Sequence, residues 1–318
     1  MTTQPQDDAQ PSSPLLGPLA DVGAGPGGPA VGAFFDLDGT LVAGYTAAAQ
    51  TKDRLRRRDL RVAEFLTIAE LAVEFRLGRR AFETLIEGSA RTVKGRTARE
   101  VDESGERIFR QAVADLIYPE MRELVQAHQL RGHTVVLSSS ALTNQVAPVA
   151  RYLGIEHIVC NRLVADKQGI LTGEVEQPVV WGATKASAVQ LFAADQHVDL
   201  AASYFYADGD EDLSLMYLVG RPRPTNPEPK LTKVAIERGW PIMRFRSRGG
   251  GPLGHPLRRG LDRLRREAGA RRHRLSGAPP TGLPPPSLTS GSLALDRPVC
   301  FNRAIGRQTC LPRSRESS

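Results

Sequence analysis

Short apolar runs alternate with helix-like patterns over most of the chain. Four or five apolar residues bounded by Gly, Ser or Asp are typical of buried strands, whereas apolar residues three or four positions apart indicate helices. The predicted strands are the run ending at Phe35, then 134–137, 157–160, 203–207 and 219–222. The predicted helices are 119–129, 143–153, 185–192 and 213–217. This alternation predicts an α/β fold: a doubly wound, mainly parallel sheet with helices on both faces.

Two regions depart from the alternation of predicted strands and helices. Residues 45–115 contain only helix-like patterns, broken near Gly78, Gly88 and Gly95, and therefore predict a helical insert after the first strand. Within 164–175, two short extended runs flank Lys167-Gln168-Gly169, which predicts a hairpin. A basic run, Arg54 with 56–58, is expected to lie on a solvated face of the insert.

The first predicted strand runs into Asp36-Leu37-Asp38-Gly39-Thr40. Acids that flank one residue project to the same side of an extended chain. Carboxylates so close repel each other unless a cation or a shared proton lies between them. The motif therefore indicates a cation or proton site, and the alternative is a strand that ends in a solvated acidic turn.

Three further polar motifs follow in order. Ser138-Ser139-Ser140 comes directly after a predicted strand, Lys185 begins a predicted helix, and Asp208-Gly209-Asp210-Glu211-Asp212 follows another strand. Taken alone, the serines could cap a helix and the lysine could face solvent. The carboxyl ends of parallel strands meet at one edge of a sheet, where such folds bind ligands. The acids and serines are therefore expected to lie together.

These four motifs, in this order, resemble those of the haloacid dehalogenase superfamily, subfamily IB, and phosphoserine phosphatases in particular. The resemblance covers residues 31–245 and implies a Rossmann-like core with a small helical cap over about 45–115. It also implies a Mg²⁺-dependent phosphomonoester hydrolase that acts on a small phosphorylated metabolite through an aspartyl-phosphate.

The resemblance implies roles for the acidic residues. Asp36 would be the nucleophile and Asp38 the general acid and base. Mg²⁺ would be held by the Asp36 carboxylate, the backbone carbonyl of Asp38 and the carboxylate of Asp208. Asp212 would contribute to the metal site through a water molecule or a second layer of contacts.

Phosphate binding would fall to three residues by the same resemblance. Lys185 would place its charge on the phosphate and the nucleophile, and so is also counted as catalytic. Ser139 is preferred as the hydroxyl donor, from its distance to the end of the following helix, with Ser138 as the alternative and Ser140 also open. Arg91, in the predicted cap, is a candidate phosphate or substrate contact.

Two other functions stay open at this stage. A phosphate-binding or scaffold protein with little catalysis could keep the same motifs, and so could a phosphotransferase that uses the same aspartyl-phosphate. Asp210 and Glu211 add negative charges to the family pattern, and these could tighten the metal site or be solvated.

The positive charge of the chain is concentrated at one end. The net charge is +7, and residues 246–318 hold fifteen Arg, no Lys and four acids, a net +11 that leaves −4 for the rest. This Pro- and Gly-rich tail predicts disorder and nonspecific contact with anionic lipid or nucleic acid. It also has the composition of GC-rich DNA translated in a wrong frame. Residues 1–30 predict a disordered leader.

The remaining features predict a cytoplasmic protein of undetermined oligomeric state. Residues 1–30 lack the pattern of a secretion signal, and no apolar stretch approaches the ~20 residues of a membrane span. Cys160, Cys300 and Cys310 show no disulfide or metal spacing. Cys160, which follows an apolar pair, is expected to be a buried and unreactive thiol.

Overall fold

A parallel sheet forms the centre of the protein. The computed structural model describes residues 16–58, 66, 69–70, 73–74, 81–245, 300–303 and 308–310. The parallel strands lie in the order β7 (Arg221–Pro224), β6 (Asp199–Ala207), β1 (Val31–Phe35), β2 (Thr134–Leu142) and β3 (His157–Asn161). β8 (Cys300–Arg303) pairs antiparallel with β3, and β9 (Gln308–Cys310) follows it. The predicted α/β class is confirmed.

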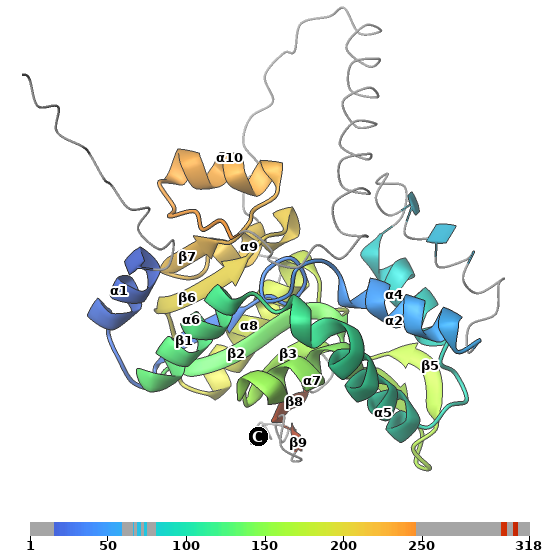
Figure 1. The fold of residues 1–318 in the computed structure, drawn as a ribbon. Coiled ribbons are helices and arrows are strands. Elements are labelled where there is room, and N and C mark those ends of the chain that lie inside the picture. Colours follow the sequence, from blue (N-terminus) through green and yellow to red (C-terminus); the bar gives the residue numbers. More distant parts are fainter. Residues whose placement is uncertain are drawn as a thin grey trace, which may run out of the picture. The chain divides into compact units, whose positions relative to one another are not determined.

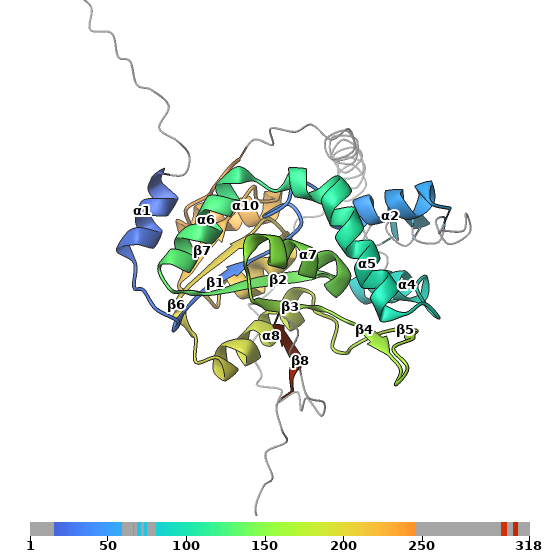
Figure 2. The ribbon, with the colours of Figure 1, turned by 60° about the horizontal axis from the view of Figure 1, so that its bottom comes forward.

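Helices cover both faces of the sheet (Figures 1 and 2). In chain order, the helices of the described residues are α1 (Leu16–Ala24), α2 (Thr46–Arg56), α4 (Phe82–Arg91), α5 (Ala98–Ile108), the π-helix η1 (Phe109–Val113), η2 (Ala114–Leu116), α6 (Pro119–Leu130), α7 (Thr143–Leu153), α8 (Gly182–Asp195), η3 (Asp210–Asp212), α9 (Leu213–Met216) and α10 (Pro229–Arg238). No helix in the described part of the chain is both long and apolar enough to cross a membrane.

The central strand β1 is buried on both sides, and its alternation orients the site. Phe34 packs edge-to-face on Phe192 of α8, with ring centroids 6.3 Å apart. Phe35 points the other way and stacks on Tyr206 at 4.6 Å, in the cluster that contains side chains of α6 and α7. Because strand side chains alternate, the residue after Phe35 returns to the α8 side.

Most predicted elements are confirmed, with shifted ends. α7 has the predicted bounds, and the predicted hairpin forms as β4 (Leu163–Ala165) and β5 (Leu171–Val175). β2 continues past the predicted end at residue 137 because Ser138 still pairs with Val159 of β3. The edge strand begins two residues later than predicted. A Cβ on Gly220 would lie 1.7 Å from the backbone oxygen of Ala201, so this close approach requires glycine.

The predicted disordered leader is wrong for residues 16–24, which form α1. Val22 is buried in the main hydrophobic cluster, and Asp21 pairs with Arg221 and Arg223 of β7. A Pro- and Gly-rich composition concealed this short helix. In the predicted disordered tail, β8 and β9 are strands, and the other tail residues lie outside the described part of the chain, as do residues 1–15.

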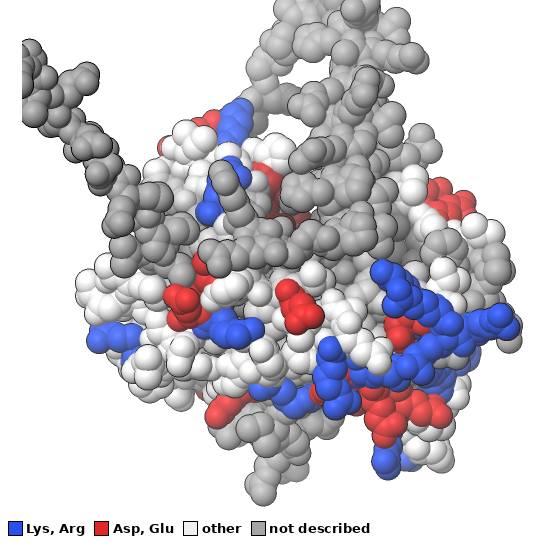
Figure 3. All heavy atoms as spheres, viewed as in Figure 1, with Lys and Arg blue, Asp and Glu red and all other residues white. Residues whose placement is uncertain are grey.

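The predicted helical insert contains α2, α4 and α5, although much of 59–80 lies outside the described residues. Basic and acidic side chains are interspersed on this part of the face shown in Figure 3. Within the insert, Arg57 and Arg107 both pair with Asp53. The prediction that Arg54 lies on a solvated face is wrong. This side chain is buried and donates to the hydroxyl of Thr92 at 2.6 Å and to its backbone oxygen at 3.1 Å.

A buried serine completes the ladder between β1 and β6 at an irregular position. The register of the two strands shifts between Val31 and Ala33. There the Ser203 hydroxyl accepts from the backbone N–H of Gly32 at 2.7 Å and donates to the backbone oxygen of Asp199 at 2.5 Å. The side chain therefore replaces backbone pairing at the strand that leads to the candidate site.

Replacing this hydroxyl should destabilise the fold. Ser203→Ala leaves a buried backbone N–H without an acceptor and is expected to lower the free energy of unfolding by about 1–3 kcal/mol. Urea unfolding followed by circular dichroism measures the change. Ser187→Ala, at an exposed position on α8, is the matched control and should stay within about 0.5 kcal/mol of the wild type. Equal effects of the two substitutions would contradict the structural role of Ser203.

Candidate active site

A buried lysine lies at the centre of the acidic residues. Lys185, in the first turn of α8, is 1% exposed. Its Nζ lies 2.8 Å from Oδ1 of Asp36 and 2.9 Å from Oδ1 of Asp212. Burial alone would lower the pKa of Lys185, but the charges of Asp212 and Asp36 outweigh burial and raise it. The lysine therefore carries its positive charge inside the protein.

Asp36 occupies the end of the central strand. Its backbone N–H donates to the backbone oxygen of Tyr206 at 2.9 Å, which extends the β1–β6 ladder by one residue. Since Phe35 pairs with Leu137 of β2 and Tyr206 of β6, Asp36 lies at the level of Ser138 and Ala207. The sequence prediction that the strand ends bring the acids and serines to one edge is consistent with this register.

Asp38 is held by Thr46, the first residue of α2. Its two carboxylate oxygens accept from the backbone N–H of Thr46 at 2.8 Å and from the Thr46 hydroxyl at 3.2 Å. Burial raises the pKa of Asp38 to about 7, helped by the charge of Asp36 and opposed by the Thr46 hydrogen bonds. A carboxyl group with this pKa can both give and take a proton near neutral pH.

Asp208 lies against the turn that follows Asp38. The Thr40 hydroxyl donates to Oδ1 of Asp208 at 3.2 Å. Gly39 has a φ of +81°, and a Cβ there would lie 2.0 Å from Oδ2 of Asp208, so only glycine allows this approach. The pKa of Asp208 is raised well above its ordinary value, first by burial and then by the charges of Asp36 and Glu211.

The site holds more negative charge than Lys185 can balance. Burial raises the pKa of Glu211 to about 8 and that of Asp212 to about 6, although Lys185 acts against the rise at both residues. Such an excess of buried carboxylates fits a divalent cation with oxygen ligands. The described residues nevertheless contain no preformed group of three or more His, Cys, Asp or Glu side chains suited to a metal. Asp212 pairs with Lys185.

The register of β2 favours a different serine from the one preferred on sequence. Val136 pairs with Phe34, so Val136 and Ser138 lie on the α8 side of the sheet, as Phe34 and Asp36 do. Ser138 is fully buried, and its Oγ has no hydrogen-bond partner among the described residues. The Oγ of Ser139 instead accepts from the backbone N–H of Ala141 at 3.1 Å.

Arg91 does not join the buried cluster. Its side chain is exposed at the end of α4, where it pairs with Glu87 at 3.6 Å. This geometry is that of a surface arginine and leaves the predicted substrate contact of Arg91 without support. Cys160 is half-buried rather than fully buried as expected. Desolvation still raises the pKa of its thiol to about 11 and keeps the thiol protonated, as expected for an unreactive cysteine.

Sequence reasoning missed Thr46 and Thr40. Thr46 is the first residue of α2 and follows Gly44 by two positions. A threonine at a helix start was the available signal, because its hydroxyl can turn back and bond to the preceding loop, here to Asp38. Thr40 lay inside the first motif, but its partner Asp208 is far away along the chain.

Comparisons with known proteins agree with this geometry. A family model for haloacid dehalogenase-like hydrolases matches residues 33–217. The chain is 32% identical over 226 residues to the inhibition of morphological differentiation protein of Streptomyces azureus, covering 68% of this chain and 79% of that protein. It is 30% identical over 218 residues to a phosphoserine phosphatase of Mycobacterium tuberculosis, covering 67% and 70%.

A solved structure of a Bordetella pertussis protein of unknown function has the same fold. Its TM-score is 0.59 at 24% identity, over 67% of this chain and 98% of that one. The family model spans more than half of the sequence and includes Asp36, Asp38, Ser138, Lys185 and Asp208. On this match, the chain belongs to the haloacid dehalogenase-like hydrolase family.

Proposed function

We propose that this protein is a Mg²⁺-dependent phosphatase that hydrolyses a small phosphomonoester through an aspartyl-phosphate on Asp36. The observation that carries the proposal is the buried Lys185, paired with both Asp36 and Asp212 at the strand ends. Relatives from Mycobacterium tuberculosis are named a phosphoserine phosphatase and a probable phosphatase, which supports the reaction class. Phosphoryl transfer needs charge neutralisation and positioning, and this cluster supplies both.

The reaction would proceed in two displacements. A carboxylate oxygen of Asp36 forms a bond to phosphorus while the bond to the leaving oxygen breaks, and Asp38 gives its proton to that oxygen. Water then attacks the phosphorus of the aspartyl-phosphate and passes its proton to Asp38, while the bond to the Asp36 oxygen breaks; inorganic phosphate leaves and both acids return to their starting states. Lys185 places its positive charge 2.8 Å from Oδ1 of Asp36, where it would neutralise charge on the phosphate as it approaches the nucleophile. The pKa of Asp38, about 7, suits a group that acts first as acid and then as base.

The metal and the phosphate would be held by neighbouring groups. The carboxylates of Asp36 and Asp208 and the backbone carbonyl of Asp38 would hold Mg²⁺, which when bound neutralises charge on the phosphate. Asp212 would orient Lys185 rather than ligate the metal directly, since Lys185 already pairs with its Oδ1. The unpartnered Ser138 hydroxyl would donate to the phosphate.

The nucleophile is tested by Asp36→Asn. The amide keeps the shape of the side chain but removes the attacking charge, so turnover of p-nitrophenyl phosphate should fall by several orders of magnitude while the protein stays folded. Steady-state kinetics and circular dichroism measure the two properties. Asp115→Asn, at an exposed position in η2, is the matched control and should keep wild-type turnover. A folded Asp36→Asn protein with unchanged activity would refute the mechanism.

The two serines give a paired test of the phosphate contact. Ser138→Ala should lower kcat/KM by about 10²-fold or more, since it removes a hydrogen bond that strengthens in the transition state. Ser139→Ala should keep most of the activity, because its hydroxyl is occupied by the backbone of Ala141. Kinetics on one ester with both variants decide between them. The reverse order of losses would restore the original sequence-based preference for Ser139.

The metal requirement is tested by chelation and replacement. Excess chelator should abolish turnover, added Mg²⁺ should restore it, and Ca²⁺ should not, because its larger and looser coordination misplaces the phosphate. Asp208→Ala should raise the Mg²⁺ concentration needed for half-maximal activity, whereas Asp115→Ala should not. Full activity in chelator would show that the carboxylates serve another purpose.

A further inference from the structure

Asn161, the last residue of β3, is a buried side chain whose hydrogen bonds join three segments of the chain. It is 1% exposed. Its Nδ2 donates to the backbone oxygens of Ser140 at 2.7 Å and of Val180 at 3.2 Å. Its Oδ1 accepts from the backbone N–H of Val180 at 2.7 Å. One amide therefore ties β3 both to the end of β2 and to the segment that leads into α8.

The bond to Ser140 lies where the ladder between β2 and β3 is irregular. Ser138 pairs with Val159, but the register shifts before the next pair, which is Leu142 with Asn161. Within that shift, the Asn161 side chain holds the backbone oxygen of Ser140, two residues after Ser138. The amide thus fixes the path of the chain where it leaves Ser138, the proposed phosphate contact.

The two bonds to Val180 lie at the start of α8. The Asn161 amide pairs with both the N–H and the oxygen of the Val180 backbone, as a neighbouring strand residue would. The next residue, Trp181, accepts at its backbone oxygen from the N–H groups of Thr184 at 3.0 Å and of Lys185 at 3.4 Å. The first turn of α8, which carries Lys185, is therefore built directly on the segment that Asn161 holds.

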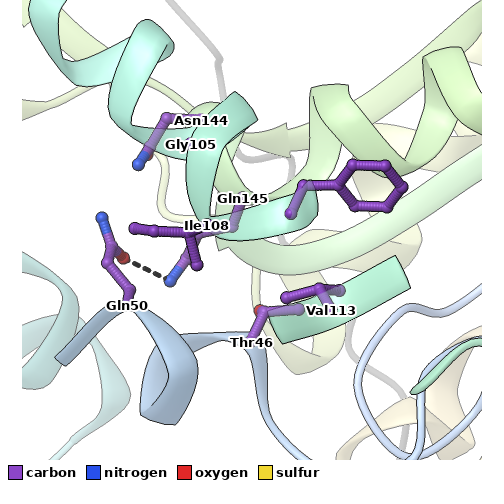
Figure 4. Close-up of a pocket in the computed structure, with 8 residues that line it drawn as sticks. Thr46, Gln50, Gly105, Ile108, Val113, Asn144 and Gln145 are labelled. Carbon is purple, nitrogen blue, oxygen red and sulfur yellow. Dashed lines mark hydrogen bonds between the residues drawn. The ribbon is translucent and has the colours of Figure 1, made fainter. Parts of the chain in front are cut away.

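A second amide holds the end of β2 to a different neighbour. The Gln145 side chain accepts from the backbone N–H of Leu142 at 3.0 Å and donates to Gln50 of α2 at 2.6 Å (Figure 4). The hollow beside this bond has room for about one water molecule and is too small for part of a substrate. Gln145 therefore ties the strand end to the helical insert, whereas Asn161 ties it to the segment before α8.

We propose that Asn161 is a positioning residue that sets the spacing between the Ser138 hydroxyl and the Lys185 ammonium group. The proposal rests on the phosphatase function proposed above, in which both groups contact the phosphate. Asn161 acts through them, because both N–H groups of its amide are already occupied by backbone oxygens. A misplacement of about 1 Å in such a group can cost about 10²-fold in rate, so this spacing matters to catalysis.

Asn161→Asp tests this role with a side chain of the same shape. At about pH 8 its carboxylate would face the backbone oxygens of Ser140 and Val180, so kcat/KM on p-nitrophenyl phosphate with Mg²⁺ should fall at least about tenfold. Burial and the two oxygens disfavour the ionised form, so at about pH 5.5 the carboxyl group should carry a proton and donate it to one of them. The ratio of variant to wild-type kcat/KM should therefore rise at least about threefold between these two pH values.

Gln129→Glu is the matched control for a purely structural role. The Gln129 amide also donates to two backbone oxygens, those of Leu153 and Gly154, each at 2.9 Å, but it does so before β3 begins, at the amino edge of the sheet. Its replacement should lower the Tm, keep kcat/KM within about twofold of the wild type and leave that ratio constant with pH. Circular dichroism establishes that each variant is folded at the assay temperature.

Asn161→Ala removes the hydrogen bonds without adding a charge, and it decides the question if Asn161→Asp does not fold. It should also lose at least about tenfold in kcat/KM while folded. Folded Asn161 variants with kcat/KM within about twofold of the wild type, or a ratio for Asn161→Asp that stays constant with pH, would overturn the positioning role and leave the phosphatase function standing. If the wild type itself hydrolyses no p-nitrophenyl phosphate with Mg²⁺, the proposed function fails and this inference fails with it.

Discussion

The ion cluster of Lys185 with Asp36 and Asp212 is the interaction on which the rest of the structure depends. Removing ions from water costs several kcal/mol each, and pairing offsets this only when the geometry is good. Here one ammonium group lies within 3 Å of two carboxylates that come from the end of β1 and from η3. Removing Lys185 would leave the buried carboxylates of Asp36 and Asp212 without their counter-charge. The carboxyl edge of the sheet and the start of α8 must therefore meet at this point.

This cluster also explains the behaviour of the surrounding acids. Lys185 balances one negative charge, whereas Asp208, Glu211 and Asp212 all have raised pKa values. A bound cation or bound protons must balance the remaining negative charge. Asp38 is held from another side by Thr46, and burial raises its pKa to about 7 although the Thr46 hydrogen bonds act against the rise. These two environments support the proposed division of roles, with Asp36 as nucleophile and Asp38 as proton carrier.

The sequence predicted the fold class and the order of the motifs because both depend on local patterns. Apolar runs located the strands, and the acids after β1 and β6 marked their carboxyl ends. The choice of Ser139 over Ser138 came from counting to a helix end, but the faces of a strand alternate, so an error of one residue moves the side chain to the opposite face. Only the pairing of Phe34 with Val136 shows which face of the sheet each serine occupies.

Partners that are distant along the chain, such as Asp212 for Lys185 and Asp21 for Arg223, leave no local signal in the sequence.

The central claim is that Asp36 carries the phosphoryl group, and mass spectrometry of acid-quenched protein tests it most directly. The protein is mixed with Mg²⁺ and p-nitrophenyl phosphate, quenched during turnover and digested. The account predicts that the peptide containing Asp36 gains the mass of one phosphoryl group, and that Asp36→Asn protein shows no such gain. Phosphorylation of a different residue, or turnover with no phosphorylated peptide under conditions that preserve acyl phosphates, would contradict it.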